Sequence, residues 1–292
     1  MKRIPLLILL SLFSLYLGCN QATETNPSAT NLLPIIDTHV HIYPRSEEIN
    51  EEYIDALVET AQENGVSTIL LGLNARHEPD RPPVFSSVHD DWVLAAAERY
   101  PDMVVPTLNG FDPSDPDSVA YVQEQLETGL WKMIGELDLR NKVKKISIAA
   151  DDTIPMQIFA LAGEYGVPVM LHYDFEYGTE QRSDGIAELE AALDGNPYTN
   201  FIYAHNCGTD MVTLMELHPN LYCEQEGGPI AKGIDLSRVV LGTDMQVHEN
   251  KPEAAAEQYE ELINNVRTAI STWSSADQEQ AASTTAKELF GL

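Results

Sequence analysis

The chain has 292 residues, of which 43% are hydrophobic, so it is long enough to bury a large core. Its 46 acidic and 17 basic side chains give a formal net charge of −29. Such a surface repels phosphate backbones, which excludes a nucleic-acid-binding protein and fits a secreted or periplasmic one.

The first segment has the pattern of an export signal. Lys2 and Arg3 precede an apolar run over residues 4–18, which is shorter than the about 20 residues that a membrane-spanning helix needs. Cys19 follows this run, and the junction resembles a bacterial lipoprotein signal, in which the cysteine carries lipid after cleavage. We predict a signal peptide over 1–19 and an exported protein, periplasmic or at the cell surface, anchored through Cys19. Conventional cleavage and an uncleaved anchor are the alternatives.

Two segments of different composition follow the signal. Residues 20–33 are polar and lack apolar periodicity, which predicts a flexible tether. From residue 34 onward, short apolar and β-branched runs alternate with helical segments. The predicted strands are 34–40, 67–73, 103–109, 131–138, 167–173, 200–206, 220–226 and 238–244. The predicted helices are 47–65, 90–102, 115–129, 154–166, 183–195 and 251–270, with short helices after the sixth and seventh strands.

Eight strand–helix units within residues 34–292 predict a single (β/α)8 barrel, the TIM-barrel fold. The alternative is an open doubly wound sheet. That fold would need a glycine-rich phosphate loop after an early strand, and the sequence contains no GxGxxG pattern. We therefore favour the barrel.

Side chains that can bind metal stand at the carboxyl ends of five predicted strands. They are His39, His41, Glu136, His172, His205 and Asp244. Barrel enzymes place their chemistry at this end of the strands, so we expect these side chains to face one another. Imidazole and carboxylate groups suit Zn²⁺, with Mn²⁺ or Fe²⁺ as alternatives.

Strand alternation predicts which side chains of the first strand point into the barrel. Asp37, His39 and His41 share one face, while Ile36 and Val40 share the other, where we expect a cover of helices. Two histidines at positions i and i+2 have Cα atoms about 6.6 Å apart, so both rings can reach one cation. Asp37 is a candidate for orienting one of these ligands.

The ordered motifs DTHVH, IGEL, LHYD, YAHN and GTD resemble the amidohydrolase superfamily, in particular its amidohydrolase-related (amidohydrolase 2-type) branch. The resemblance extends over residues 34–292, including the stretch 95–116 and the closing TTAKELFGL. It implies a metal centre formed by His39, His41, His172, His205 and Asp244. Glu136 stands where two-metal members carry a bridging group, and one-metal members do without a bridge, so one ion and two ions are both open.

The resemblance also implies an activity. A bound cation would activate water and polarise a carbonyl or phosphoryl group, and Asp244 would pass the proton of that water to the leaving group. We expect a hydrolase of a small-molecule amide, ester, lactone or phosphoester. One alternative is a metal-dependent decarboxylase of a small aromatic or unsaturated carboxylic acid, known in the same branch. Another is a non-catalytic tethered binding protein, which would have no need of Asp244.

Further polar residues lie near the predicted strand ends. Arg76, His77 and His248 are candidates for contacts with the substrate, and the alternative is an ordinary solvated loop position. Glu224 and Glu226 end the seventh strand, and we weigh a pocket-lining role for one of them evenly against packing.

The two cysteines beyond Cys19 are Cys207 and Cys223. Export would permit a disulfide between them, but we expect two buried thiols. No CxxC pattern indicates a cysteine-based zinc site. For partners we expect a small-molecule substrate, no nucleic acid and membrane contact only through the N-terminal lipid; a homodimer is an open alternative.

Overall fold

Strands and helices alternate along the chain in the computed structural model, which describes residues 32–43, 50–73, 85, 87, 90–179, 181–205, 207–248 and 252–292. The strands are β1 (Ile35–Tyr43), β2 (Val66–Leu73), β3 (Val104–Leu108), β4 (Met133–Asn141), β5 (Ile146–Ser147), β6 (Val169–Tyr173), β7 (Phe201–Tyr203), β8 (Leu221–Gln225), β9 (Val239–Leu241) and β10 (Met245–His248). The α-helices are α1 (Glu51–Glu63), α2 (Asp90–Arg99), α3 (Asp117–Glu127), α4 (Thr153–Tyr165), α5 (Arg182–Gly195), α6 (Thr209–Leu217), α7 (Pro252–Ile270), α8 (Ser275–Glu279) and α9 (Thr285–Phe290). No helix within these ranges is long and apolar enough to cross a membrane.

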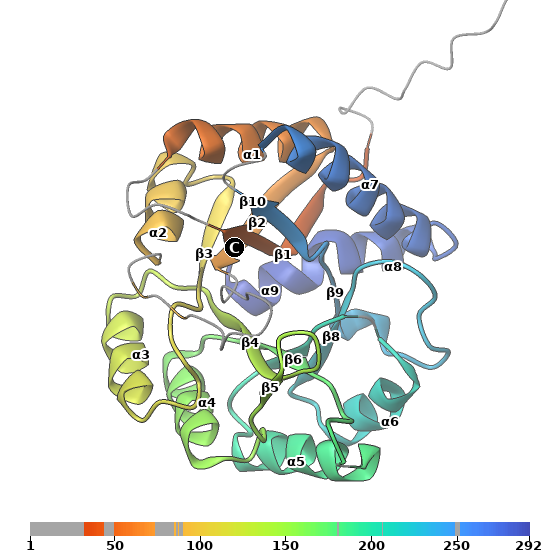
Figure 1. The fold of residues 1–292 in the computed structure, drawn as a ribbon. Coiled ribbons are helices and arrows are strands. Elements are labelled where there is room, and N and C mark those ends of the chain that lie inside the picture. The colour runs from red at the N-terminus through yellow and green to blue at the C-terminus, as the bar shows by residue number, and fades with distance from the viewer. Residues whose placement is uncertain are drawn as a thin grey trace, which may run out of the picture.

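The strands form one sheet that closes into a barrel. The order is β10-β1-β2-β3-β4-β6-β7-β8-β9, and β5 forms an antiparallel hairpin with β4. β9 pairs with β8 and β10 pairs with β1, and only residues 242–244 separate β9 from β10. These two strands are therefore the halves of one interrupted strand that closes the ring. The predicted (β/α)8 barrel is confirmed, with the helices arranged around the strands (Figure 1).

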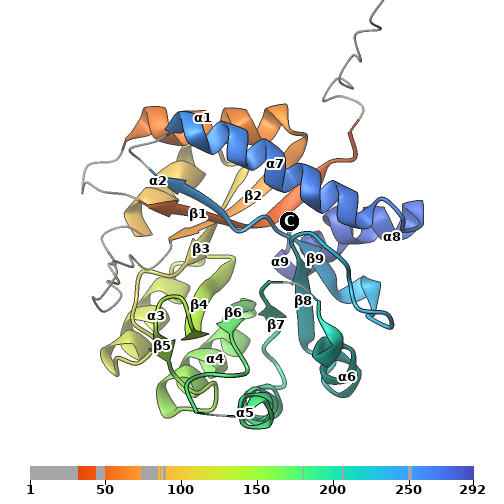
Figure 2. The ribbon, with the colours of Figure 1, turned by 45° about the vertical axis from the view of Figure 1, so that its right-hand side comes forward.

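The outer helices pack their apolar faces on the barrel. At the start of α1 the side chain of Asn50 accepts a hydrogen bond from the backbone N–H of Tyr53, which satisfies a free N–H of the first turn. The helix then buries Tyr53, Ile54, Leu57, Val58 and Ala61. α1 and α7 lie side by side over the first strands and β10 (Figures 1 and 2).

A separate apolar cluster fills the amino-terminal end of the barrel interior. Its strand members are Ile36, Leu70, Val105, Met133, Met170, Ile202 and Val240; each is the first or second residue of its strand except Leu70, which pairs with Val105. Ala286, Leu289 and Phe290 of α9 complete the cluster, and Figure 1 shows α9 crossing the middle of the ring. The last helix therefore closes this end of the barrel as a plug.

The position of Ile36 differs from the sequence prediction. Ile36 belongs to the interior cluster, so the expectation that it faces the helices together with Val40 is wrong. The register of β1 against β2 is irregular between Ile35 and Ile36 and again between Asp37 and Val40, which breaks the simple alternation of sides. Val40 does pack against the outer core as expected.

We expect Phe290→Ala to lower the free energy of unfolding by about 3–5 kcal/mol, because it leaves a cavity inside the barrel. Phe290 is 4% exposed, whereas Leu292, two residues further on, is 45% exposed. Leu292→Ala is the matched control and should change the stability by no more than about 0.5 kcal/mol. Urea unfolding followed by circular dichroism measures both. Equal losses in the two variants would contradict the plug.

Candidate metal centre

The structure brings the six predicted metal-binding residues together at the carboxyl end of the barrel. They are His39 and His41 of β1, Glu136 of β4, His172 of β6, His205 after β7, and Asp244 between β9 and β10. His39, His41 and Glu136 are buried, and the other three are partly buried. Two sets of donor atoms contain these six residues and share Glu136, and a third group combines His39 and His205 with Glu224 and Glu226.

The first set consists of His39, His41, Glu136 and Asp244. Oε2 of Glu136 lies 3.6 Å from Nε2 of His39 and 3.5 Å from Nε2 of His41. Oδ1 of Asp244 lies 3.7 Å and 3.5 Å from the same two nitrogens. Ligand atoms that surround one cation at about 2.1 Å lie about 3.0–3.5 Å from one another. The set thus has roughly the spacing of a coordination shell.

The hydrogen bonds of the two rings fix where their protons lie. Nδ1 of His39 lies 2.9 Å from a carboxylate oxygen of Glu224, and Nδ1 of His41 lies 3.1 Å from the carbonyl oxygen of Leu73. Both partners only accept hydrogen bonds, so each Nδ1 carries the proton. In the neutral rings, both Nε2 atoms then present lone pairs to each other, at 2.8 Å.

These facing lone pairs need a positive charge between them. The oxygens of Glu136 and Asp244 point at the same place. Oδ1 of Asp244 is buried and has no hydrogen-bond partner within the described part of the chain. Imidazole nitrogens and carboxylate oxygens that converge in this way need positive charge, which ring protons or a divalent cation can supply. The donor atoms are nitrogen and oxygen, which suits Zn²⁺ or Mn²⁺.

The second set consists of Glu136, His172 and His205. Oε1 of Glu136 lies 2.7 Å from Nε2 of His205 and 3.0 Å from Nδ1 of His172. The two ring nitrogens are themselves 2.7 Å apart. Because each oxygen of Glu136 faces a different set, this carboxylate stands where a group bridging two cations would stand.

Two further glutamates support the histidines. Glu224 accepts from Nδ1 of His39 and, at 3.2 Å, from the backbone N–H of His205. Glu226 is hydrogen-bonded to Nδ1 of His205. Partners of this kind fix the tautomer and orientation of a metal-binding ring. The sequence did not decide between a pocket-lining role and packing for these glutamates. The feature that could have indicated their role is their i, i+2 spacing at the end of β8, next to the strand that precedes His205.

The pKa values follow from this crowding of carboxylates. Burial by itself would lower the pKa of His39, but the charges of Glu224 and Glu136 raise it above its ordinary value. Burial likewise opposes the charged form of His205, yet Glu136 and Glu226 raise its pKa to about 11. Burial would raise the pKa of Glu136, but His39 and His205 hold it well below its ordinary value. Without a metal, protonated imidazoles balance the carboxylates; a cation would replace those protons.

Asp37 holds backbone rather than a ligand ring. Its Oδ1 accepts from the backbone N–H of His39 at 3.2 Å and of Thr243 at 3.0 Å. Its Oδ2 accepts from the hydroxyls of Thr243 at 2.7 Å and Tyr259 at 2.8 Å. Burial raises the pKa of Asp37 to about 6, against the opposing effect of these hydrogen bonds. The predicted orienting role therefore takes the form of fixing the two segments that carry His39 and Asp244.

Backbone geometry also serves the centre. His205 (φ 64°) and Asp244 (φ 47°) adopt the left-handed conformation that side chains disfavour. A Cβ on Gly242 would lie 1.7 Å from Oε1 of Glu224 and 2.8 Å from Cβ of His39. Only glycine fits at that position beneath the donor set.

The remaining predicted residues have different outcomes. Arg76, His77 and Cys19 lie outside the described residues. The backbone of His248 ends β10, opposite Tyr43, and its side chain is not among those described. These predictions therefore stay predictions.

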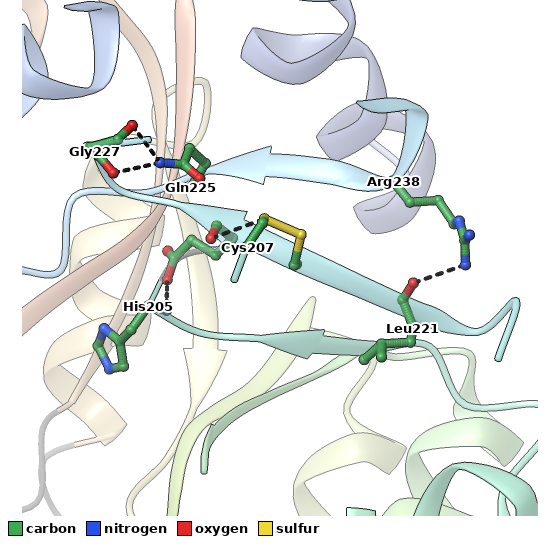
Figure 3. Close-up of a disulfide and its surroundings, with 9 residues drawn as sticks. His205, Cys207, Leu221, Gln225, Gly227 and Arg238 are labelled. Carbon is green, nitrogen blue, oxygen red and sulfur yellow. Dashed lines mark hydrogen bonds between the residues drawn. A yellow bond between two sulfur atoms is a disulfide. The ribbon is translucent and has the colours of Figure 1, made fainter. Parts of the chain in front are cut away.

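Cys207 and Cys223 form a disulfide, so the expectation of two free buried thiols is wrong (Figure 3). Cys223 of β8 is paired with Tyr203 of β7. Cys207 lies four residues after Tyr203 in the sequence. Their Cα atoms are 5.6 Å apart, within the range that a disulfide spans. The bond joins the segment after His205 to the strand that carries Glu224.

Solved structures with the same fold include three enzymes. A probable 2-pyrone-4,6-dicarboxylic acid hydrolase from Acinetobacter baumannii, with citric acid bound, has a TM-score of 0.59 and 14% identity, covering 88% of this chain and 99% of its own. The 5-carboxyvanillate decarboxylase from Sphingomonas paucimobilis has a TM-score of 0.59 and 13% identity, covering 89% and 100%. That from Novosphingobium aromaticivorans, complexed with manganese and 4-hydroxy-3-methoxy-5-nitrobenzoic acid, has a TM-score of 0.55 and 13% identity, covering 89% and 96%.

At these identities the likeness shows a common fold. The comparison with curated proteins found no match. The family model described as Amidohydrolase matches residues 36–292, which is nearly the whole barrel and contains every residue of both donor sets. The chain therefore belongs to the amidohydrolase family.

Proposed function

We propose that the protein is a metal-dependent hydrolase that uses water to cleave a small-molecule amide, ester, lactone or phosphoester. The observation that carries this proposal is Glu136, whose two oxygens face two donor sets, with the carboxylate of Asp244 beside the first. His39 and His41 with Asp244 would hold one cation. His172 and His205 would hold the other.

A divalent cation bound here would supply Lewis acidity, which polarises a carbonyl or phosphoryl group and makes water easier to deprotonate. Asp244 is 25% exposed, so a substrate can reach it from the barrel mouth. Its carboxylate can accept a proton from the attacking water and give it to the leaving group. Its other oxygen, Oδ2, accepts a weak hydrogen bond of 3.5 Å from Gln246.

A second candidate is decarboxylation of an aromatic carboxylic acid, which the two structurally similar decarboxylases favour. A substrate carboxylate would need a cationic partner at the barrel mouth. Lys142 is exposed, and its Nζ lies 4.0 Å from Asp174, which in turn lies 3.9 Å from Nε2 of His172. We keep hydrolysis as the main proposal because the carboxylate of Asp244, beside the first donor set, suits a reaction that takes a proton from water.

We also propose that the protein is exported and anchored by lipid at Cys19, with its substrate as its partner. The Cys207–Cys223 disulfide supports export, since disulfides persist in oxidising compartments.

A substrate panel separates the two activities. The Zn²⁺- or Mn²⁺-loaded protein is incubated with lactones, amides, esters and phosphoesters in a pH-stat, and with aromatic carboxylic acids under CO₂ detection. We expect acid release from one hydrolysable class and no CO₂. Metal-dependent CO₂ release without hydrolysis would establish the second candidate instead, and no turnover of either kind would count against an enzyme.

We expect Asp244→Asn to lower kcat by about 100-fold or more, because asparagine cannot accept the proton of water. The variant should retain the fold by circular dichroism. Asp91→Asn, an exposed aspartate on α2, is the matched control for the loss of one charge and should keep full activity. Unchanged kcat in Asp244→Asn would show that another group moves the proton.

We expect Glu224→Gln to weaken metal binding by about 10- to 100-fold, because the amide orients His39 without the negative charge of the carboxylate. Titration of the metal-free protein with Zn²⁺, followed by calorimetry, measures the affinity. Glu288→Gln removes the same charge from an exposed position on α9 and should bind Zn²⁺ as the parent does. Equal affinity of both variants would remove Glu224 from the metal centre.

A further inference from the structure

The Cys207–Cys223 disulfide joins the segment that follows His205, a member of the second donor set, to the neighbouring strand β8. We propose that this disulfide is a positioning element for His205, so that its reduction selectively weakens binding of the cation held by His172, His205 and Glu136. This inference rests on the proposed two-cation centre.

His205 lies beyond the end of the sheet. The β7–β8 ladder ends with the pair Tyr203 and Cys223, so no ladder bond holds the backbone of His205 itself. Figure 3 shows the disulfide just beyond His205, bridging this departing segment back to β8. Cys207 is fully buried, and its carbonyl oxygen accepts from the backbone N–H of Ala231 at 3.0 Å.

The backbone of His205 needs such support. Its left-handed conformation (φ 64°) is unfavourable for a residue with a Cβ and persists only where the surroundings impose it. Three connections to the β8 side impose it here: the disulfide two residues later, the hydrogen bond from its N–H to Glu224, and the bond from its ring to Glu226. The disulfide is the covalent one of the three.

Cys223, the other cysteine of the disulfide, lies in a strand that is paired on both sides. Cys223 belongs to β8, which pairs with β7 on one side and, through Cys223 and Val239, with β9 on the other. Breaking the disulfide therefore leaves Cys223 and Glu224 in the sheet, while the segment of His205 loses its covalent tie to β8 and keeps only hydrogen bonds.

The first donor set does not depend on the disulfide in this way. His41 is paired with Gly72 of β2 and with Gln246 of β10, so β1 is held on both sides at this height. His39 keeps its hydrogen bond to Glu224, which stays in β8. Reduction should thus separate the two metal sites, with loss at one and retention at the other.

The test uses the full-length chain with Cys19→Ser, so that Cys207 and Cys223 are its only cysteines. This protein is titrated with Co²⁺ before and after reduction. A water-soluble phosphine reduces the disulfide: the S–S bond breaks, two thiols form, and the phosphine becomes its oxide with oxygen from water. Co²⁺ reports each site by its visible absorption and by calorimetry. A Cys207→Ala/Cys223→Ala variant, measured with and without phosphine, controls for binding of Co²⁺ by new thiols or by the reductant.

We expect the oxidised protein to bind two Co²⁺ per chain. Reduction, or the double substitution, should weaken one site by about 10-fold or more, with loss of its absorption band, and leave the other within twofold. Equal affinities before and after reduction would overturn the inference. So would a single Co²⁺ in the oxidised protein, or loss of both sites together with the circular dichroism of the fold.

The substrate panel tests the proposed hydrolase activity separately from the role of the disulfide. A redox-dependent second site in a protein that hydrolyses nothing in the substrate panel would reject the proposed function and leave this inference standing. Hydrolysis by a protein whose two sites ignore the disulfide would do the reverse.

Discussion

At the seam where the first and last strands of the barrel meet, the carboxylate of Asp37 connects the first strand to the break in the last one. It accepts hydrogen bonds from the backbone of His39 on one side of this seam and from Thr243 on the other, and Tyr259 of α7 donates to it from outside. The interruption of the last strand at residues 242–244 lies at the same seam. Because the chain turns at this break, Asp244 lies beside His39 and His41 of β1 and is not part of the strand ladder. The contacts that close the barrel therefore also place Asp244 beside His39 and His41.

The carboxylates behind the histidines make the centre costly to leave without positive charge. Glu136 and Glu224 are both buried against imidazole nitrogens. Buried charges of one sign destabilise a fold unless protons or cations compensate them. The barrel tolerates this arrangement because its other end is an ordinary apolar core sealed by α9. Stability and chemistry are therefore divided between the two ends of the same strands.

Much of this architecture could be predicted from the sequence, because each barrel strand is a short apolar run bounded by turn residues and each ligand stands at the end of its run. The failures have a common physical origin in contacts that join distant segments. Ile36 changed sides because the register of β1 against β2 is irregular, which no local pattern encodes. The pairing of Cys207 with Cys223 and the support that Glu224 gives His39 depend on neighbouring strands. The second half of the last strand, β10, was missed because the apolar run Val239–Leu241 ends at residues 242–244, which read as the end of the strand.

The plug formed by α9 has a consequence for the order in which the protein can be built. Ala286, Leu289 and Phe290 fill the same cavity as side chains from the start of β1, although some 250 residues separate them in sequence. Domains usually begin to fold from the amino terminus while synthesis proceeds. Here the barrel interior stays incomplete until the final turn of helix has left the ribosome. The first strand, although it is synthesised first, therefore completes its packing only after the chain as far as α9 has been made.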